Sequence, residues 1–271
     1  MKAILRAAIT VAVSSLSLFA AVSYAGQPDF EKAFQGKDGC FLLYDMKSRR
    51  TVVEYNKKRC GERFFACSTF KIPLALMAFD QDILRDENAL VKWDGVKHEI
   101  DAWNRDQTPK SWLKYSAVWV SQWITPQLGM DKIKRYLKDF RYGNQDMSGG
   151  LTQAWLSSTL KISAAEQIRF LERFWMGKLP VSARAVDLVK TSMDMEKSAS
   201  GAVLHGKTGS GFIGDRNDPV GQRVGWFIGH LARGNEEYIF ATNYTGKATS
   251  EPAGYAARGI TKIVLSELGL F

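Results

Sequence analysis

An apolar segment around Ser68 constrains the fold more strongly than any other part of the chain. Residues Thr69 to Phe79 contain no helix breaker except Pro73, which lies in the first turns of the predicted helix, where proline is tolerated. Apolar side chains occupy nearly every face of this helix, so we expect it to be buried. Ser68 is a suitable N-cap residue. The chain must therefore build its core around a helix that begins at a serine.

The same segment places a hydroxyl group and an amine close together. Side chains three residues apart on a helix have Cβ atoms about 5 to 6 Å apart, so the Lys71 amine can reach the Ser68 hydroxyl. An unassisted serine is a poor nucleophile at neutral pH, and a neighbouring base activates it. A Ser-X-X-Lys motif also arises by chance, as a capping serine followed by a solvated lysine. It gains weight only from the other motifs of the chain.

The N-terminus has the pattern of a secretory signal peptide. Lys2 and Arg6 precede an uncharged run over residues 7–22, and Ser23 and Ala25 provide a small-residue cleavage site. The run is too short to favour a membrane span, and no later stretch is long and apolar enough to form one. We therefore expect residues 1–25 to be a signal peptide, and we expect no membrane anchor.

The remainder, residues 26–271, is expected to be a single catalytic domain. It shows no internal repeat, low-complexity tract or flexible linker, and its length suits one large domain or two lobes that share a core. The formal net charge of the chain is +9, but Lys and Arg are scattered along it. This favours a basic exported protein over a nucleic-acid-binding protein, and the predicted location is the periplasm. Whether the protein is a monomer or a homodimer is left open.

Three cysteines indicate one disulfide. Export places them in an oxidising setting, where one pair can bridge. Strands at Cys40–Tyr44 and Thr51–Tyr55 would form a hairpin, and Cys60 lies just past the strand that pairs with Cys40. We therefore predict a disulfide between Cys40 and Cys60, and we expect Cys67 to be a small buried apolar residue. Three cysteines without a matching histidine cluster give no metal signature, so no metal is expected.

The order of patterns predicts strands at both ends of the domain and helices between them. A short helix at 29–35 and the hairpin are followed by a helical or irregular stretch from about 66 to 196. The later elements are strand-like runs at Ala202–Gly206, Arg223–Leu231 and Tyr238–Tyr244 and an amphipathic helix over 260–268. The predicted fold class is α+β: an antiparallel sheet flanked by terminal helices, with an all-α lobe inserted and the active site in the cleft between them. The sheet part is expected at about 26–65 and 197–271, and the helical part at about 66–196.

Further short motifs accompany the serine and lysine. Lys207, Thr208 and Gly209 end a strand-like run and are followed by Ser210. A strand edge there can present an N–H group to a developing oxyanion, while Lys207 and Thr208 offer a charge and a hydroxyl group to an anionic substrate. Each motif alone is weak evidence, because a strand end, a surface serine or a Gly-Asn turn explains it. The two motifs between are Ser116-Ala117-Val118 and Tyr142-Gly143-Asn144.

Taken in this order, the motifs resemble the penicillin-recognising serine enzymes, which share Ser-X-X-Lys and Lys-Thr-Gly signatures. The resemblance is closest to the class D β-lactamases, or oxacillinases, and covers nearly all of the mature chain. The matching stretches are STFK at 68–71, SAV at 116–118, YGN at 142–144, the pair Trp155-Leu156 and KTG at 207–209. The class A pattern has Ser-Asp-Asn where this chain has SAV. Glu166 forms a capping box with Ser163, so it is not given the role of the deacylating class A glutamate.

The resemblance implies a serine β-lactamase that hydrolyses the lactam amide of penicillin-type antibiotics and confers resistance to them. Ser68 would attack the lactam carbonyl, and the backbone N–H groups of Ser68 and Ser210 would hold the oxyanion. Ser116 would relay a proton to the leaving nitrogen. Lys71 would react with carbon dioxide to form a carbamate (N6-carboxylysine), which would activate the water that releases the acyl group. No other cofactor is implied.

A carbamate can form at Lys71 only where the amine is neutral and a hydrogen-bond donor is near. Free lysine titrates near pH 10.4, so a neutral amine at pH 7 requires a pKa lowered by about 3 units. A dry pocket would lower it, and a hydrogen-bond donor would hold the new anion. The residues expected to supply these conditions are Phe70, Val118, Trp155 and Leu156, with the Trp155 indole N–H as donor. A purely core role for Trp155 is equally compatible with the sequence.

The substrate is expected to contact both ends of the predicted cleft. The substrate-binding residues implied by the resemblance are Val118, Lys207, Thr208, Gly209, Ser210 and Arg258. Of these, Lys207, Thr208 and Arg258 would bind the substrate carboxylate. Arg258 begins the predicted final helix, and a solvated position on the helix surface is an equal alternative for it.

Two other functions share this nucleophile. One is a penicillin-sensing domain, which is acylated by the drug and does not release it; the other is a peptidoglycan D-Ala-D-Ala carboxypeptidase or transpeptidase. A generic exported α+β domain is the third alternative. His98, His205 and His230 show no partner pattern, which disfavours a catalytic triad. The choice among penicillins, cephalosporins and carbapenems depends on loop shapes that the sequence does not specify.

Overall fold

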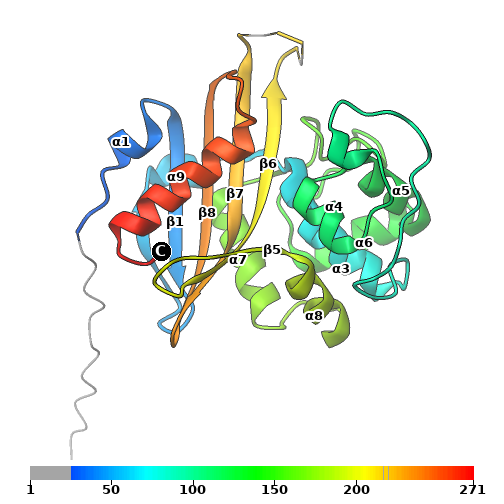
Figure 1. Cartoon of the computed structure of the whole chain (residues 1–271), viewed down its shortest axis with the longest axis horizontal. Helices are drawn as coiled ribbons and strands as arrows, with labels where there is room; N and C mark the ends of the chain where they lie inside the picture. The colour runs from blue at the N-terminus through cyan, green and yellow to red at the C-terminus, as the bar shows by residue number, and fades with distance from the viewer. Residues whose placement is uncertain (1–25, 216, 219) are drawn as a thin grey trace, which may run out of the picture.

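The computed structural model describes residues 26–215, 217–218 and 220–271 (Figure 1). At its centre is a six-stranded antiparallel sheet with the order β2-β1-β8-β7-β6-β5. Its strands are β1 (Asp38–Asp45), β2 (Arg50–Tyr55), β5 (Asp194–Lys197), β6 (Val203–Ile213), β7 (Gln222–Arg233) and β8 (Glu236–Lys247). The α+β fold with an antiparallel sheet is therefore confirmed. The predicted signal peptide lies outside the described residues.

Helices cover both faces of the sheet. On one face lie α1 (Phe30–Phe34) and α9 (Ala253–Glu267), while α7 (Ala164–Trp175) packs on the other face, toward the helical part of the molecule (Figure 1). The remaining elements are α2 (Lys57–Gly61), β3 (Phe64–Phe65), η1 (Cys67–Phe70), α3 (Lys71–Asp80), η2 (Asp101–Trp103), α4 (Pro109–Tyr115), α5 (Val118–Leu128), α6 (Met130–Phe140), β4 (Lys161–Ile162) and α8 (Ala183–Ser192). In the described part of the chain, no helix is both long and apolar enough to cross a membrane.

The alternation of side chains along the strands produces two hydrophobic cores. In β1, Phe41 and Leu43 point into the core beneath α1 and α9, whereas Cys40 and Leu42 point into the core shared with the helical part. Successive side chains of a strand face opposite sides, so one buried strand serves both cores. The helical part is thus fixed to the sheet by the second core.

The predicted buried helix exists but begins differently. Every residue of α3 except its last, Asp80, is buried. Ser68, predicted as its N-cap, instead lies inside the 3-10 helix η1, and Phe70 occupies the N-cap position without a side-chain cap bond. The N-cap prediction for Ser68 is therefore wrong. Its hydroxyl group makes no cap bond and lies beside Lys71 instead.

Three predicted boundaries are also wrong. Strand β5 lies within the stretch predicted as helical, because its pairing with β6 is a long-range contact that four residues of local sequence do not reveal. Strand β6 continues through Lys207-Thr208-Gly209 to Ile213, so this motif lies within the strand and not at its end. Helix α9 begins at Ala253, so Arg258 lies inside the helix and not at its start. The predicted boundary of β6 lies too early because Gly209 and Gly211, which follow Thr208, are residues that often mark a turn.

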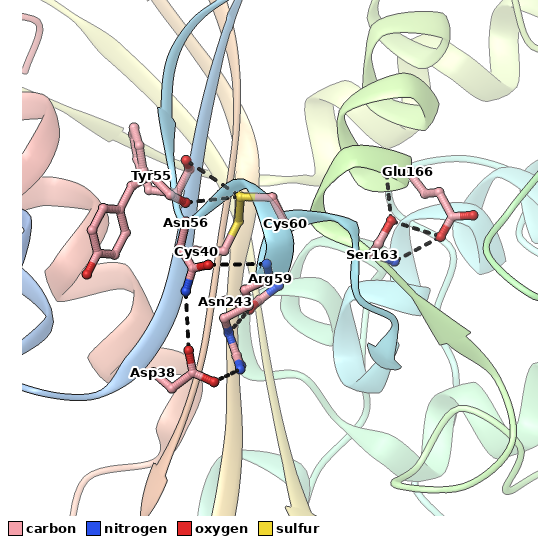
Figure 2. Close-up of a disulfide and its surroundings, with 10 residues drawn as sticks. Asp38, Cys40, Tyr55, Asn56, Arg59, Cys60, Ser163, Glu166 and Asn243 are labelled. Carbon is pink, nitrogen blue, oxygen red and sulfur yellow. Dashed lines mark hydrogen bonds and ion pairs between the residues drawn. A yellow bond between two sulfur atoms is a disulfide. The ribbon is translucent and has the colours of Figure 1, made fainter.

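The structure forms a disulfide between Cys40 and Cys60, the pair expected from the hairpin (Figure 2). In the chain-entropy model, such a link contributes about 3 kcal/mol for a loop of this size. The neighbouring Arg59 is buried and donates to Asp38 at 2.6 Å and to Asn243 at 2.9 Å. The bridge and these bonds attach α2 to β1 and β8.

Two histidines face each other on the sheet beneath the end of α7. His205 of β6 pairs in register with His230 of β7, and the Trp175 ring stacks on His230 with 4.0 Å between ring centroids. Burial lowers the pKa of His230 to about 4 and also lowers the pKa of His205. Both imidazoles are therefore neutral in the folded protein at pH 7.

We expect the free energy of unfolding to decrease as the pH falls from about 6.5 toward 4. Unfolded histidine binds a proton near pH 6.5, whereas folded His230 binds one only near pH 4. Between these values the unfolded state holds more protons, so acid favours unfolding. Urea unfolding between pH 7 and pH 4.5 measures this. His230→Gln should flatten the dependence, and a slope equal to that of the wild-type protein would contradict the assignment.

Candidate active site

Ser68 and Lys71 lie where the helical part meets the sheet. Lys71 Nζ is 3.3 Å from Ser68 Oγ. The preceding residue, Cys67, has a left-handed backbone with φ 48°, and its N–H donates to the Trp155 carbonyl at 2.9 Å. A non-glycine residue in this conformation is strained, and such strain persists where the surrounding structure holds it. The turn at Cys67 therefore fixes the direction in which the nucleophile enters its helix.

Lys71 is fully buried. Burial, followed by the positive charge of Lys207, holds the pKa of the Lys71 amine well below its usual range. Desolvation disfavours the charged form of an amine, and a second cation nearby acts in the same direction. The neutral amine can therefore accept a proton from Ser68, and it can also react with carbon dioxide.

Trp155 offers a hydrogen-bond donor in the same region. Its ring is fully buried beside Phe70, with 5.3 Å between ring centroids, and its Nε1 has no partner within the described residues. A buried unpaired N–H costs about 1 to 3 kcal/mol, so its presence indicates an acceptor. Val118 begins α5, and Leu156 packs on the core that contains Phe70; both are partly buried. The buried Phe70 and Trp155 rings, with one free donor, fit a carbamate on the buried Lys71.

Ser116 lies at the C-terminus of α4 in an unusual backbone conformation. Its φ is 60°, which is left-handed, and its Oγ is buried with no partner in the described part of the chain. The residue before it, Tyr115, lines the same cavity as Lys207 and Thr208. These features suit a hydroxyl group that serves a ligand, and the proton-relay role of Ser116 stays a prediction.

The open edge of β6 supplies backbone donors. Strand β5 pairs only with Val203–Gly206, so residues 207–213 are paired with β7 alone within the described structure. The N–H of Phe212 points away from β7, because it donates to Ser157 Oγ at 2.9 Å. N–H groups two residues apart in a strand point to the same side. The N–H of Ser210 therefore points to the open edge, as an oxyanion donor requires.

Two glycines allow this edge to approach the nucleophile. A Cβ atom at Gly209 would lie 3.3 Å from Cys67 Cβ, and one at Gly211 would lie 2.6 Å from Cys67 Sγ. Glycine is required because η1 packs directly on the strand. Burial raises the pKa of the Cys67 thiol to about 12, so Cys67 serves packing and is not a thiolate nucleophile.

Lys207 and Arg258 share a cavity of about 110 Å³. Lys207 is buried and its Nζ donates to the Thr208 carbonyl at 2.9 Å. Burial lowers the pKa of Lys207 to about 7; Asp194 opposes this shift and Arg258 adds to it. The cavity is lined by Leu113, Lys114, Tyr115, Asp194, Gly206, Lys207, Thr208, Phe227, Tyr255 and Arg258. It lies between the end of α4 and the sheet, where the cleft was predicted.

Arg258 is not a freely solvated residue of the helix surface. It lines the cavity and forms ion pairs with Asp194 at 3.5 Å and Glu196 at 2.6 Å. Sequence reasoning missed both carboxylates. Their spacing in β5, two residues apart, is the only local signal, and it becomes meaningful once β5 is known to be a strand. Among the described residues, no group of three or more His, Cys, Asp or Glu side chains is placed to hold a metal ion.

A buried lysine bonded to a partly buried serine, beside an open strand edge and a cationic cavity, defines the site of a serine enzyme that forms an acyl intermediate. Comparison with known proteins identifies the group. Residues 20–266 match the family described as the penicillin binding protein transpeptidase domain. Beta-lactamase OXA-1 of Escherichia coli is 42% identical over 244 residues, which cover 88% of this chain and 85% of the relative.

Solved structures agree with this result. Class D beta-lactamase BAT-2 is 34% identical with a TM-score of 0.81, over 92% of this chain and 99% of that one. The C-terminal domain of the Bacillus licheniformis BlaR penicillin receptor is 30% identical with a TM-score of 0.82, over 90% of this chain and 96% of that one. The chain belongs to the penicillin-binding transpeptidase family, and within it to the class D β-lactamases.

Proposed function

We propose that this β-lactamase cleaves the lactam amide of penicillin-type antibiotics through an acyl-enzyme at Ser68, and thereby confers resistance to them. The observation that carries the proposal is the 3.3 Å contact between Ser68 Oγ and the buried Lys71 Nζ. Burial of a lysine side chain costs folding free energy, so a fully buried lysine beside a serine indicates a chemical role.

Acylation follows from the positions of the residues. Lys71 removes the Ser68 proton as Oγ bonds to the lactam carbonyl carbon. The negative charge that develops on the carbonyl oxygen is stabilised by the N–H groups of Ser68 and Ser210. As the carbon–nitrogen bond breaks, the proton taken by Lys71 passes through Ser116 to the leaving nitrogen, and Lys71 is again a neutral amine. The product is an ester at Ser68.

Deacylation needs a base at the same place, which removes a proton from the water that attacks the Ser68 ester. We propose that carbon dioxide supplies it by forming a carbamate on Lys71 Nζ. The Trp155 indole N–H would donate to this group, and Phe70, Val118 and Leu156 would exclude water around it. The unpaired Nε1 of Trp155 supports this assignment.

Substrate binding is assigned to the other side of the site. Lys207, Thr208 and Arg258 line one cavity and would bind the substrate carboxylate, which needs cationic partners and a hydroxyl donor. Val118, Gly209 and Ser210 would contact the rest of the ligand. Carbon dioxide is the only cofactor proposed.

The test is penicillin hydrolysis by the purified mature protein at fixed pH, first degassed and then with bicarbonate, with intact mass recorded during turnover. We expect turnover that rises with bicarbonate and an acyl adduct that disappears when substrate is exhausted. A persistent adduct without turnover under both conditions would indicate a penicillin sensor instead. The likeness to the BlaR penicillin receptor makes the sensor the second candidate.

We expect Trp155→Phe to lower hydrolysis at ambient carbon dioxide by about tenfold, and added bicarbonate to restore much of it. The variant keeps an aromatic ring against Phe70 and removes the one N–H that would hold the carbamate. Trp123→Phe, an exposed residue of α5, is the matched control. A loss in Trp155→Phe that bicarbonate does not change would assign Trp155 to packing alone.

We also propose that residues 1–25 are removed during export to the periplasm. The charged start, apolar run and small residues at Ser23 and Ala25 support this. An intact mass that begins at Gly26 after periplasmic extraction is the expected result, and a full-length mass would contradict it.

A further inference from the structure

Arg258 is held by two carboxylates from one strand. Its Nη2 donates to Glu196 Oε2 at 2.6 Å, and its Nη1 lies 3.5 Å from Asp194 Oδ2. Its guanidinium carbon also lies 5.8 Å from the centroid of the Phe227 ring. Two different nitrogens are thus bonded to two different residues, which fixes the plane of the guanidinium and leaves other N–H donors for a ligand.

This arrangement follows from the periodicity of the two elements. Asp194 and Glu196 are two residues apart in β5, so their side chains share one face of the sheet. Arg258 and Lys262 are four residues apart in α9, so they share one face of the helix. Lys262 Nζ bonds the second oxygen of Glu196.

We infer that Glu196 and Asp194 are positioning residues for the substrate carboxylate, because they fix the Arg258 guanidinium in the cavity beside Lys207. The inference rests on the proposed function. A free arginine side chain has many rotamers, and each carboxylate bond made before the substrate arrives reduces the freedom lost on binding. Neither residue needs to touch the substrate.

The cations around the cavity outnumber the carboxylates, which favours binding of an anion. Lys262 pairs with Glu196, so Glu196 orients Arg258 without cancelling the positive charge of the cluster. Asp194 lines the cavity between two cations and opposes the lowering of the Lys207 pKa that burial and Arg258 cause. Asp194 therefore favours the charged form of Lys207, and Arg258 and Lys262 add further positive charge for the ligand.

The experiment compares benzylpenicillin with its methyl ester, which lacks the carboxylate. We expect Glu196→Ala to reduce kcat/KM for the acid by about tenfold, mainly through KM, and to leave kcat/KM for the ester unchanged. Glu196→Gln keeps an oxygen acceptor and should recover part of the loss. Glu236→Ala removes a partly exposed glutamate that pairs with Arg233 at the turn between β7 and β8, and it is the matched control.

Asp194→Asn has a different expected signature. It removes the anion that supports the charge on Lys207, so the pH above which kcat/KM for the acid declines should shift to a lower value, and the shift should be larger for the acid than for the ester. Equal losses for acid and ester in these variants would show a structural role and overturn the inference. If the wild-type protein hydrolyses neither compound, the proposed function fails first, and the two failures are distinguished.

Discussion

Replacement of Ser68 by alanine is expected to abolish penicillin hydrolysis, prevent any acyl adduct and leave the stability of the fold unchanged. The expected loss in kcat is on the order of 10⁶-fold, as for other enzymes in which a nucleophile and its base act together. Stability is unaffected because Ser68 makes no cap bond in either η1 or α3. Hydrolysis assays, intact mass after incubation with penicillin, and urea unfolding are the measurements.

The control is Ser163, a serine whose replacement should lower stability and leave hydrolysis unchanged. Ser163 caps α7: its Oγ accepts from the Glu166 N–H, and the Glu166 carboxylate accepts from the Ser163 N–H. Ser163→Ala should therefore cost about 1 kcal/mol of stability and leave hydrolysis intact. Turnover retained in Ser68→Ala, or an adduct formed at another residue, would exclude Ser68 as the nucleophile.

The elements with strong local signals could be predicted from the sequence. The amphipathic pattern of α6 and the capping box of α7 lie where the residues indicate, because caps and helical periodicity act over a few positions. The hairpin of β1 and β2 is likewise local. From these, the arrangement of strands at both ends and helices between follows.

The features that could not be predicted from the sequence depend on contacts between residues far apart in the chain. The sequence predicts the end of a strand at Gly209, but Gly209 and Gly211 are glycine because Cys67 packs against both. Strand β6 extends to Ile213 because it pairs with β7 as far as Gln222. A glycine chosen for close packing and a glycine chosen for a turn look identical in a single sequence.

The residues of the candidate site also divide into those that the sequence predicts and those that it does not. The motif residues Ser68, Lys71 and Lys207 were predicted, since their chemistry is recognisable from residue type and spacing. The partners of Arg258 were not, because Asp194 and Glu196 reach it only through the pairing of β5 with β6 and the packing of α9 over that sheet. Residues that orient others have no signature of their own until the fold places them.

Replacement of Lys71 by alanine should retain the fold but cause deacylation to collapse. The variant lacks the amine that takes the Ser68 proton and that would carry the carbamate, so acylation slows and the ester, once formed, has no base to release it. We expect intact mass to show an acyl adduct that accumulates slowly and persists, with steady-state turnover reduced by at least about 10³-fold. Bicarbonate should not restore it.

The fold should tolerate the change because two effects oppose each other. Removing the side chain leaves a cavity in the core, which destabilises. It also removes an amine whose pKa is lowered in the folded state: below its unfolded pKa the unfolded chain binds a proton that the folded chain does not, so this burial costs stability at pH 7. Lys110→Ala, an exposed position in α4, is the control. Unchanged turnover in Lys71→Ala would remove Lys71 from the mechanism, whereas a persistent adduct would assign to it the step that separates a β-lactamase from a penicillin sensor.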